Sequence, residues 1–243
     1  MKTAALAPQR TRRPQASPAD GVIAVVGVEL VADVAGALYW PEQGLLAVAD
    51  LHFEKGSAFA ERGVLLPPYD TAATLARLTQ VIARHAPRVV VSLGDSFHDG
   101  GGAARLADTD RAALKALQRG RDWIWIAGNH DPDPADGIGG RFVAELALGA
   151  LTFRHRPSPG ACGEIAGHLH PVARVSSRGR TVSRRCFAGD GRRLVMPAFG
   201  AYAGGLNVRA RAFAEMFDTL AFTAHMLGEK RVYAVAAKRC LPD

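Results

Sequence analysis

Cysteine is scarce in this chain, and the few thiols have no paired spacing. Cys162, Cys186 and Cys240 are the three cysteines in 243 residues, which excludes a disulfide framework and a zinc knuckle of paired cysteines. Reduced thiols are typical of a cytoplasmic protein, so we expect that location. For Cys162, which is close in sequence to several histidines, packing is the simplest interpretation.

Long apolar runs are lacking as well. The most apolar stretch, residues 21–40, contains Glu29 and Asp33 and falls short of the roughly 20 clean residues that a membrane-spanning helix needs. These acids, and the lack of a small-residue cleavage site, also argue against a twin-arginine signal after the arginines at 10–13. We therefore expect no membrane partner.

Acidic residues are outnumbered by basic ones. The formal net charge is +7, and residues 154–211 hold eleven arginines against the two acids Glu164 and Asp190. Such a balance favours a polyanionic partner, with nucleic acid first and an anionic membrane second. A proteome that is rich in arginine would give the same excess, so charge alone leaves the partner open.

The distribution of apolar residues predicts one domain after a short tail. Residues 1–20 are mainly Ala, Pro, Gln, Arg and Ser, so we predict a disordered basic tail. Residues 21–243 contain no linker long enough to divide them, and we predict that they form a single domain.

Strand and helix patterns alternate in the first half. Apolar runs at 45–49, 89–93 and 122–127 indicate buried strands, and residues 70–85 and 108–119 have helical spacing. This alternation predicts an α/β fold with a mainly parallel first sheet. Short strands separated by turn signals are predicted at 142–153, 164–166, 172–175, 180–187, 194–196 and 232–236. We expect them to form a second sheet, with helices outside both sheets.

Polar residues follow four of these predicted strands directly. Asp50 comes after an apolar run, and Asp95, Asn129 and His168 each come after a glycine that ends one. Ligands of open α/β folds lie at the carboxyl ends of strands, so we expect the four segments to converge. The glycines are expected to permit tight turns before the ligands.

The residue types in these segments indicate two metal ions. The four segments are Asp50-Leu51-His52, Gly94-Asp95, Gly128-Asn129-His130-Asp131 and Gly167-His168-Leu169-His170. Their carboxylate, carboxamide and imidazole groups favour Mn²⁺, with Fe or Zn²⁺ as alternatives, over Mg²⁺ and Ca²⁺. Two such ions about 3.5–4 Å apart activate a shared water and neutralise a phosphoryl group, which predicts hydrolysis of a phosphate ester.

The ordered motifs resemble those of the calcineurin-like metallophosphoesterase superfamily over roughly residues 45–205. The resemblance implies a four-layer αββα sandwich of two mixed β-sheets, and attack by a hydroxide that bridges two metal ions. It implies that His130 is the proton donor to the leaving oxygen or a stabiliser of the transition state. The implied ligands, with Asp95 shared, are Asp50, His52, Asp95 and His170 for one ion and Asp95, Asn129, His155 and His168 for the other.

Two of these roles depend on the family pattern. His155 alone would indicate a structural histidine, but the superfamily has a ligand between its Asn-His and Gly-His-x-His motifs, where His155 is the one histidine. Gly94-Asp95-Ser96-Phe97-His98 lacks the Asp-Arg-Gly of the protein phosphatases and is similar to the DNA-break repair nucleases. This similarity implies that His98 and His130 act as a catalytic pair, and packing beneath the site is the alternative for His98.

A narrower resemblance, to the ligase-associated DNA damage response endonuclease (PdeM) family, covers nearly the whole chain after the tail. It is carried by residues 49–56, 93–99, 167–171 and 196–208, and the last of these segments has no general metal-binding role. The resemblance implies a bacterial metal-dependent phosphodiesterase or endonuclease that acts on DNA in repair. It also implies a functional association with an ATP-dependent DNA ligase and a helicase.

Candidate substrate contacts lie beside these motifs. Lys55 and the loop 197–205 are expected near the phosphate or on the rim, and Tyr202 in that loop could stack on a base. A tight turn between sheets is the alternative for the loop. Arg154 and Arg156 flank His155 in the basic stretch and are expected to contact phosphates.

The leading interpretation is therefore a phosphodiesterase or endonuclease acting on DNA. A phosphoesterase for a small nucleotide or cyclic nucleotide is the alternative, and the basic surface separates the two only weakly. A scaffold that has lost catalysis is disfavoured because all seven expected ligands and His130 are present. The oligomeric state and the preference for single or double strands stay open.

Overall fold

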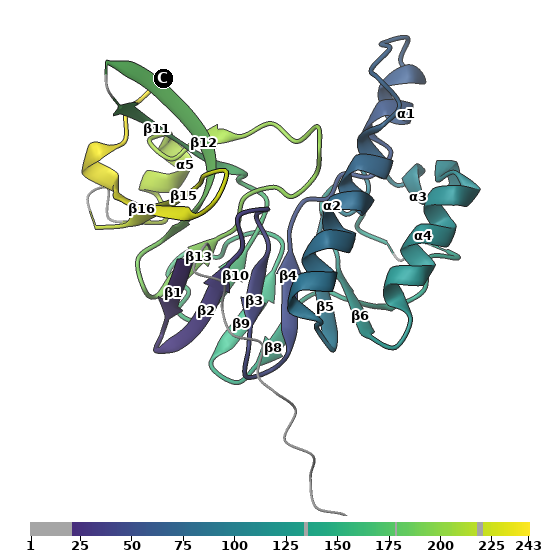
Figure 1. The fold of residues 1–243 in the computed structure, drawn as a ribbon, viewed down its shortest axis with the longest axis horizontal. Helices are drawn as coiled ribbons and strands as arrows, with labels where there is room; N and C mark the ends of the chain where they lie inside the picture. The colour runs from purple at the N-terminus through teal and green to yellow at the C-terminus, as the bar shows by residue number, and fades with distance from the viewer. Residues whose placement is uncertain (1–20, 134–135, 178, 218–220) are drawn as a thin grey trace, which may run out of the picture.

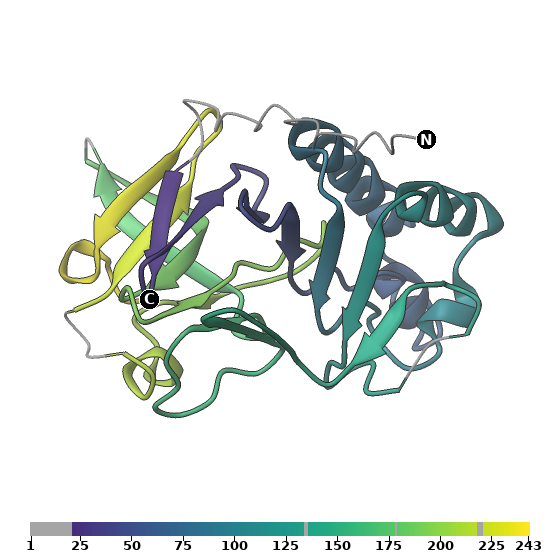
Figure 2. The same cartoon turned by 90° about the horizontal axis from the view of Figure 1, so that it is seen from below.

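The structure is a computed structural model that describes residues 21–133, 136–177, 179–217 and 221–243. The predicted basic tail, residues 1–20, lies outside this part of the chain. Two β-sheets pack face to face, and helices cover the outer face of the first sheet (Figures 1 and 2). The predicted α/β fold with two mixed sheets is confirmed.

The first sheet combines antiparallel and parallel strands. In spatial order its strands are β1 (Gly21–Val25), β2 (Val28–Ala32), β3 (Leu38–Trp40), β4 (Leu45–Val48), β5 (Val89–Leu93), β6 (Asp122–Ile126) and β7 (Arg141–Val143). Strands β1 to β4 pair antiparallel, and β4 to β7 pair parallel. The expectation of a mainly parallel first sheet is therefore wrong for its N-terminal half, which the apolar pattern did not identify as strands.

The second sheet contains the remaining strands. They are β8 (Leu146–Leu148), β9 (Leu151–Arg154), β10 (Glu164–Ala166), β11 (Pro171–Ser177), β12 (Arg180–Gly189), β13 (Arg193–Val195), β14 (Leu206–Asn207), β15 (Thr223–Leu227) and β16 (Val232–Ala236). Parallel pairing joins β9, β10 and β13. The predicted strand 142–153 is three strands in two sheets, because β7 joins the first sheet and a turn at Gly149 reverses the chain between β8 and β9.

Alternation along the strands divides the first sheet between two cores. In β4, Leu45 and Ala47 pack against the second sheet, whereas Leu46 and Val48 pack towards the helices. Helix α2 (Asp70–His85) covers that outer face with Leu75 and other buried residues, and α4 (Asp108–Gln118) lies beside it. The two-residue period of buried strands thus builds the inner layers of the sandwich.

The remaining helices are short. They are α1 (Lys55–Ala60), α3 (Gly102–Arg105), α5 (Arg211–Ala214) and the 3-10 turn Ala237–Arg239. Over the outer face of the second sheet, Phe213 of α5 packs with Phe217 and Phe222 against Ala188 and Ala224 of the strands. The fourth layer is therefore thin. No helix in the described ranges is long and apolar enough to cross a membrane.

Candidate metal centre

The ends of the parallel strands bring the predicted ligands together. Asp50 and His52 follow β4, Asp95 follows β5, Asn129 follows β6, and His155 follows β9. His168 and His170 lie between β10 and β11. Six of the seven form two clusters, in each of which one ligand atom per residue lies within 4.8 Å of the others. These clusters are Asp50, His52 and His170, and Asp95, His155 and His168.

The imidazole nitrogens have the spacing of ligands to a common ion. His52 Nε2 lies 3.4 Å from His170 Nε2, and His155 Nε2 lies 3.2 Å from His168 Nδ1. Nitrogens bound about 2.1 Å from one ion lie about 3.0–3.4 Å apart at ordinary coordination angles. Asn129 Oδ1 is 2.9 Å from His155 Nε2, so the seventh ligand joins the second cluster. The donor set therefore fits two divalent ions.

Buried carboxylates supply the negative charge of the site. Asp50 Oδ1 is 3.3 Å from His170 Nε2 and 3.7 Å from His155 Nδ1, so it lies beside both clusters. Burial opposes ionisation of Asp95, but the hydrogen bond and charge of His155 hold the pKa of Asp95 well below its usual range. Burial and the charge of His170 lower the pKa of His52 to about 3. A neutral imidazole beside an ionised carboxylate is the protonation state that binds metal.

Backbone strain is concentrated in these ligands. Asp50, His52, Asp95, His168 and His170 all have a positive φ, between 45° and 70°. This conformation costs about 1–3 kcal/mol per non-glycine residue and persists where the surroundings enforce it. It is typical of functional sites, and here it occurs in five of the seven predicted ligands.

The glycines before the ligands allow close approach as well as turns. Gly94 has a φ of 73°, and a Cβ atom there would lie 2.5 Å from the His155 ring. Gly128 is not in the left-handed region, but its Cβ would lie 2.2 Å from the backbone nitrogen of Asp95. The expectation of tight turns is thus correct for Gly94, whereas Gly128 is required by crowding at the ligands.

His130 and His98 lie together at the open side of the clusters. Their rings stack with centroids 5.3 Å apart, and each lies within 5.6 Å of the His52 ring. The His130 side chain is 41% exposed, and its Nε2 is 3.9 Å from Asp95 Oδ2. Burial and the charge of Lys55 lower the pKa of His98. The exposed His130 and the half-buried His98 therefore lie together beside the first ligand cluster, and their catalytic roles stay a prediction.

Lys55 and Tyr202 connect the loop 197–205 to the helical side of the site. Lys55 Nζ donates to the Tyr202 carbonyl at 3.1 Å, and the Tyr202 hydroxyl donates to the Pro67 carbonyl at 3.0 Å. Lys55 is close enough to influence His98, which agrees with a place near the phosphate. The hydroxyl of Tyr202 is occupied by protein, and stacking of its ring on a base stays a prediction.

Arg154 and Arg156 have different surroundings although they flank the same histidine. Arg154 Nη2 binds Glu145 at 2.9 Å, its Nη1 donates to Ser158 at 2.8 Å, and its Nε is 3.7 Å from Glu164. Arg156 is exposed, and no carboxylate of the described residues lies within 4 Å of it. The expectation of a phosphate contact therefore fits Arg156 and does not fit Arg154, whose charge is already compensated.

Residues outside the predicted set also hold the site. The Asp131 carboxylate accepts the backbone N–H groups of Ser96 at 2.8 Å and Phe97 at 3.0 Å, which fastens the third motif to the second. Its place in the Gly-Asn-His-Asp motif was a signal for this role, but the motif alone does not reveal the partners.

The segment 196–208, which has no general metal-binding role, supports the ligands from behind. Phe199 and Gly200 donate to the carbonyls of Ala49 and Asp50 at 2.8 and 3.1 Å. Arg77 donates to the Phe199 carbonyl and Arg185 to the Ala198 carbonyl. No pattern in the sequence indicated these two arginines, because each contact joins elements far apart along the chain.

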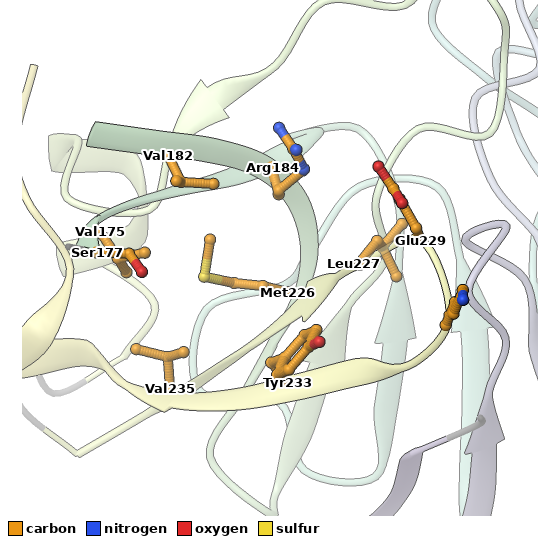
Figure 3. A pocket seen from close by; sticks show the side chains of 11 residues that line it. Val175, Ser177, Val182, Arg184, Met226, Leu227, Glu229, Tyr233 and Val235 are labelled. Atoms are coloured by element: carbon orange, nitrogen blue, oxygen red, sulfur yellow. The ribbon is translucent and has the colours of Figure 1, made fainter. Parts of the chain in front are cut away.

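Two hollows border the second cluster. One, of about 470 Å³, includes Asn129, Arg154, His155 and Arg156 in its lining, and the other, of about 260 Å³, includes Arg156 and His168. A cavity of about 690 Å³ lies between the β11–β12 and β15–β16 hairpins, with Met226 pointing into it (Figure 3). None of the predicted site residues lines that larger cavity, so it has no part in the metal centre.

Comparisons with known proteins agree with this geometry. No curated protein matches the chain. Among solved structures, nuclease MPE of Pseudomonas putida is similar, with 28% sequence identity and a TM-score of 0.68. The similarity covers 89% of this chain and 100% of that nuclease. A family model described as calcineurin-like phosphoesterase matches residues 45–183. Because that match spans more than half of the chain, the protein belongs to the calcineurin-like phosphoesterases and is a hydrolytic phosphoesterase.

Proposed function

We propose that the protein is a metal-dependent phosphodiesterase that cleaves DNA and acts in DNA repair. The observation that carries the proposal is the stacked pair of His98 and His130 at the open side of two ligand clusters. The segment 94–98 resembles a motif of the DNA-break repair nucleases, and this resemblance supports the proposal. So does the similarity to nuclease MPE of Pseudomonas putida. An association with an ATP-dependent DNA ligase and a helicase belongs to the same proposal.

The donor set supports two divalent ions, with Mn²⁺ as the expected metal and Fe or Zn²⁺ as alternatives. Asp50, His52, Asp95 and His170 would hold one ion, and Asp95, Asn129, His155 and His168 the other. When bound, the ions supply an activated water as nucleophile and positive charge that neutralises the phosphoryl oxygens. The surroundings that enforce the strained backbone of five ligands keep these positions fixed before the substrate arrives.

The side chains at the open side would then divide the remaining work. His130 Nδ1 donates to the His98 carbonyl at 2.8 Å, so Nε2 is the nitrogen that faces the substrate, and the protonated ring would give its Nε2 proton to the leaving oxygen. His98 has a lowered pKa and is therefore neutral near pH 7, where it orients the substrate rather than protonating it. Arg156 provides a fixed positive charge for a phosphate next to the reacting one.

The alternative, hydrolysis of a small nucleotide or cyclic nucleotide, is favoured by one observation. Four arginines of the basic stretch 154–211 are ion-paired within the protein. These are Arg154 with Glu145, Arg174 with Asp243, Arg193 with Glu164 and Arg211 with Glu215. The surface available to a long polyanion is therefore smaller than the composition indicates.

Three substrates separate these functions. The Mn²⁺-loaded protein is assayed with bis-p-nitrophenyl phosphate, p-nitrophenyl phosphate and plasmid DNA, with Asp95→Asn as the control. We expect hydrolysis of the diester and of DNA, both lost in Asp95→Asn. Hydrolysis of the monoester alone contradicts the nuclease proposal. Full activity of Asp95→Asn on every substrate contradicts the assignment of the metal ligands.

A further inference from the structure

Arg156 separates the two hollows beside the second ligand cluster. The larger is polar and is lined by Ala127, Gly128, Asn129, Ala144, Glu145, Arg154, His155 and Arg156. The smaller is mainly apolar and is lined by Arg156, Pro157, Pro159, His168, Leu169, Ala212, Glu215 and Met216. Each hollow therefore reaches a predicted metal ligand, and Arg156 belongs to both walls. A chain that passes over Arg156 would contact the metal centre and both hollows.

The carboxylates of both hollows are already compensated. Glu145 in the larger hollow binds Arg154 at 2.9 Å, and Glu215 in the smaller hollow binds Arg211 at 2.8 Å. Arg156 has no such partner within 4 Å among the described residues. It is thus the charged group at this place that is available to an anion from outside.

The segment that carries Arg156 is held rigidly. Pro157 restricts the backbone of Arg156 to extended conformations. Ser158 then accepts a hydrogen bond from Arg154 at 2.8 Å and donates its own N–H to Glu164 at 2.8 Å. Because both contacts fix the loop just after Arg156, the guanidinium is presented without the ordering cost of a mobile loop.

The smaller hollow has the character of a site for a flat apolar group. Pro157, Leu169, Ala212 and Met216 give it mainly apolar walls, which it shares with Arg156, His168 and Glu215. Apolar and aromatic surfaces bind the face of any base, because every base presents a π-surface. The hollow borders His168, whereas His130 and His98 lie beside His52. Neither His130 nor His98 lines it, so the hollow lies apart from the place expected for the leaving group.

We propose that this smaller hollow is a subsite for a nucleobase, and that Arg156 binds a phosphate of the same strand. The base belongs to the nucleotide that keeps the cleaved phosphate, since the leaving oxygen faces His130. The inference rests on the proposed phosphodiesterase function and adds a substrate class, diesters that carry a nucleoside on the retained side.

Two small diesters test the subsite in the full-length, Mn²⁺-loaded protein. One is a p-nitrophenyl ester of thymidine phosphate, used as its 5′ or 3′ isomer according to which the wild type prefers. The other is methyl p-nitrophenyl phosphate, which has the same leaving group and no base. The variant is Ala212→Trp, which fills the hollow from α5, and Met216→Ala is a second variant that removes a wall without adding bulk.

We expect Ala212→Trp to lower kcat/KM for the thymidine ester at least about fivefold, which is the lower end of the effect of losing one stacked base. The kcat/KM for the methyl ester should stay within about twofold of the wild-type value. Met216→Ala should likewise lower kcat/KM more for the thymidine ester than for the methyl ester. Equal loss on both esters, or unchanged hydrolysis of the thymidine ester by both variants, overturns the subsite. A wild type that hydrolyses neither diester but cleaves p-nitrophenyl phosphate contradicts the proposed function itself.

Arg156 is tested with DNA, because the methyl ester has no neighbouring phosphate. Arg156→Gln should raise KM for an oligonucleotide about tenfold, the effect of one hydrogen bond to a charged group. The matched control is Arg192→Gln, which removes an exposed arginine at the opposite end of β13 from the metal centre. Equal effects of the two variants on the oligonucleotide overturn the role of Arg156.

Discussion

His130 Nδ1 donates a hydrogen bond of 2.8 Å to the backbone carbonyl of His98. A carbonyl oxygen only accepts, so the proton of the neutral His130 ring must be on Nδ1. Nε2 is therefore the nitrogen that exchanges a proton with the substrate. It lies 3.9 Å from Asp95 Oδ2 and so faces the metal clusters. The backbone of one histidine thus sets the tautomer of the other.

His130→Ala should lose turnover and keep the metal ions. His130 belongs to neither ligand cluster, and loss of a general acid lowers kcat by about 10²- to 10⁴-fold. The measurement is kcat on DNA, whose alkoxide leaving group needs a proton, together with metal content by elemental analysis. Asp95→Asn is the control that should lose both. An empty metal centre in His130→Ala would refute this separation of roles.

His98→Ala should reduce activity less than His130→Ala does. The backbone carbonyl that orients His130 survives the substitution, so what is lost is the ring's contact with the substrate and its stacking on His130. We expect about a tenfold fall in kcat/KM for DNA, the value of one hydrogen bond to a charged group.

His98→Phe separates this role from packing. The Phe ring keeps the stacking against His130 and the contact with Phe59, whose ring centroid lies 5.5 Å from that of His98. If the Phe variant recovers wild-type kcat/KM while the Ala variant does not, His98 only packs beneath the site.

Much of the fold follows from local patterns, and the exceptions have physical reasons. Helix α2 and strands β5 and β16 have the predicted bounds, because each contains enough apolar residues to mark it. Strand β3 has three residues, too few to show a period. Strand β15 contains Thr223 and His225 and owes its place to pairing with β12 and β16 on either side.

The candidate site also has features that the sequence predicted and features that it did not. Motif spacing was enough to predict that Asp50, Asp95, Asn129 and His168 converge, since each directly follows a parallel strand. The sequence did not reveal that Arg154 is compensated by Glu145 and Glu164, because those pairs form only when β9 lies between β8 and β10. Charge counts along a sequence overestimate the charge that a folded surface offers.

Gly94→Ala should destroy the metal centre, whereas Gly120→Ala should not. Both glycines have a φ near 70°, but a Cβ at 94 would lie 2.5 Å from the His155 ring and a Cβ at 120 meets nothing within 4 Å. Both variants should lose about 1 kcal/mol or more of unfolding free energy from the backbone alone. Metal titration by calorimetry should show loss of binding in Gly94→Ala only. Normal metal binding by that variant would contradict the crowding at His155.

Asp33 should make the stability depend on pH. This buried carboxylate accepts hydrogen bonds from His85 Nε2 and the Ala35 N–H, both at 2.8 Å, and pairs with Arg84. Burial opposes ionisation, but these partners together lower the pKa of Asp33. A folded pKa below the unfolded value of about 3.9 means that the carboxylate stabilises the fold above pH 3.9. That contribution disappears as the pH falls through the folded pKa.

The comparison of wild type with Asp33→Asn measures this contribution. Breaking a buried ion pair costs about 3 kcal/mol or more. The free energy of unfolding in urea at pH 7 should therefore be lower by that amount in Asp33→Asn than in the wild type, and this difference is the gap to be followed. The gap should narrow as the pH falls below about 4. Asp122→Asn, which changes an exposed carboxylate at the start of β6, should show almost none. A gap in Asp33→Asn that is the same at every pH would contradict the lowered pKa.

DNA affinity should fall with salt, but less steeply than eleven arginines would give. The logarithm of the binding constant falls by about 0.7–0.9 per phosphate contact for each tenfold rise in salt. Anisotropy titrations with the inactive His130→Ala protein measure this slope. Arg156→Gln in that background should reduce it by about one contact. Arg174→Gln should leave it unchanged, because Arg174 is paired with Asp243 at 3.0 Å. An affinity that does not change with salt would mean that the arginines reflect composition and that the substrate is not a polyanion.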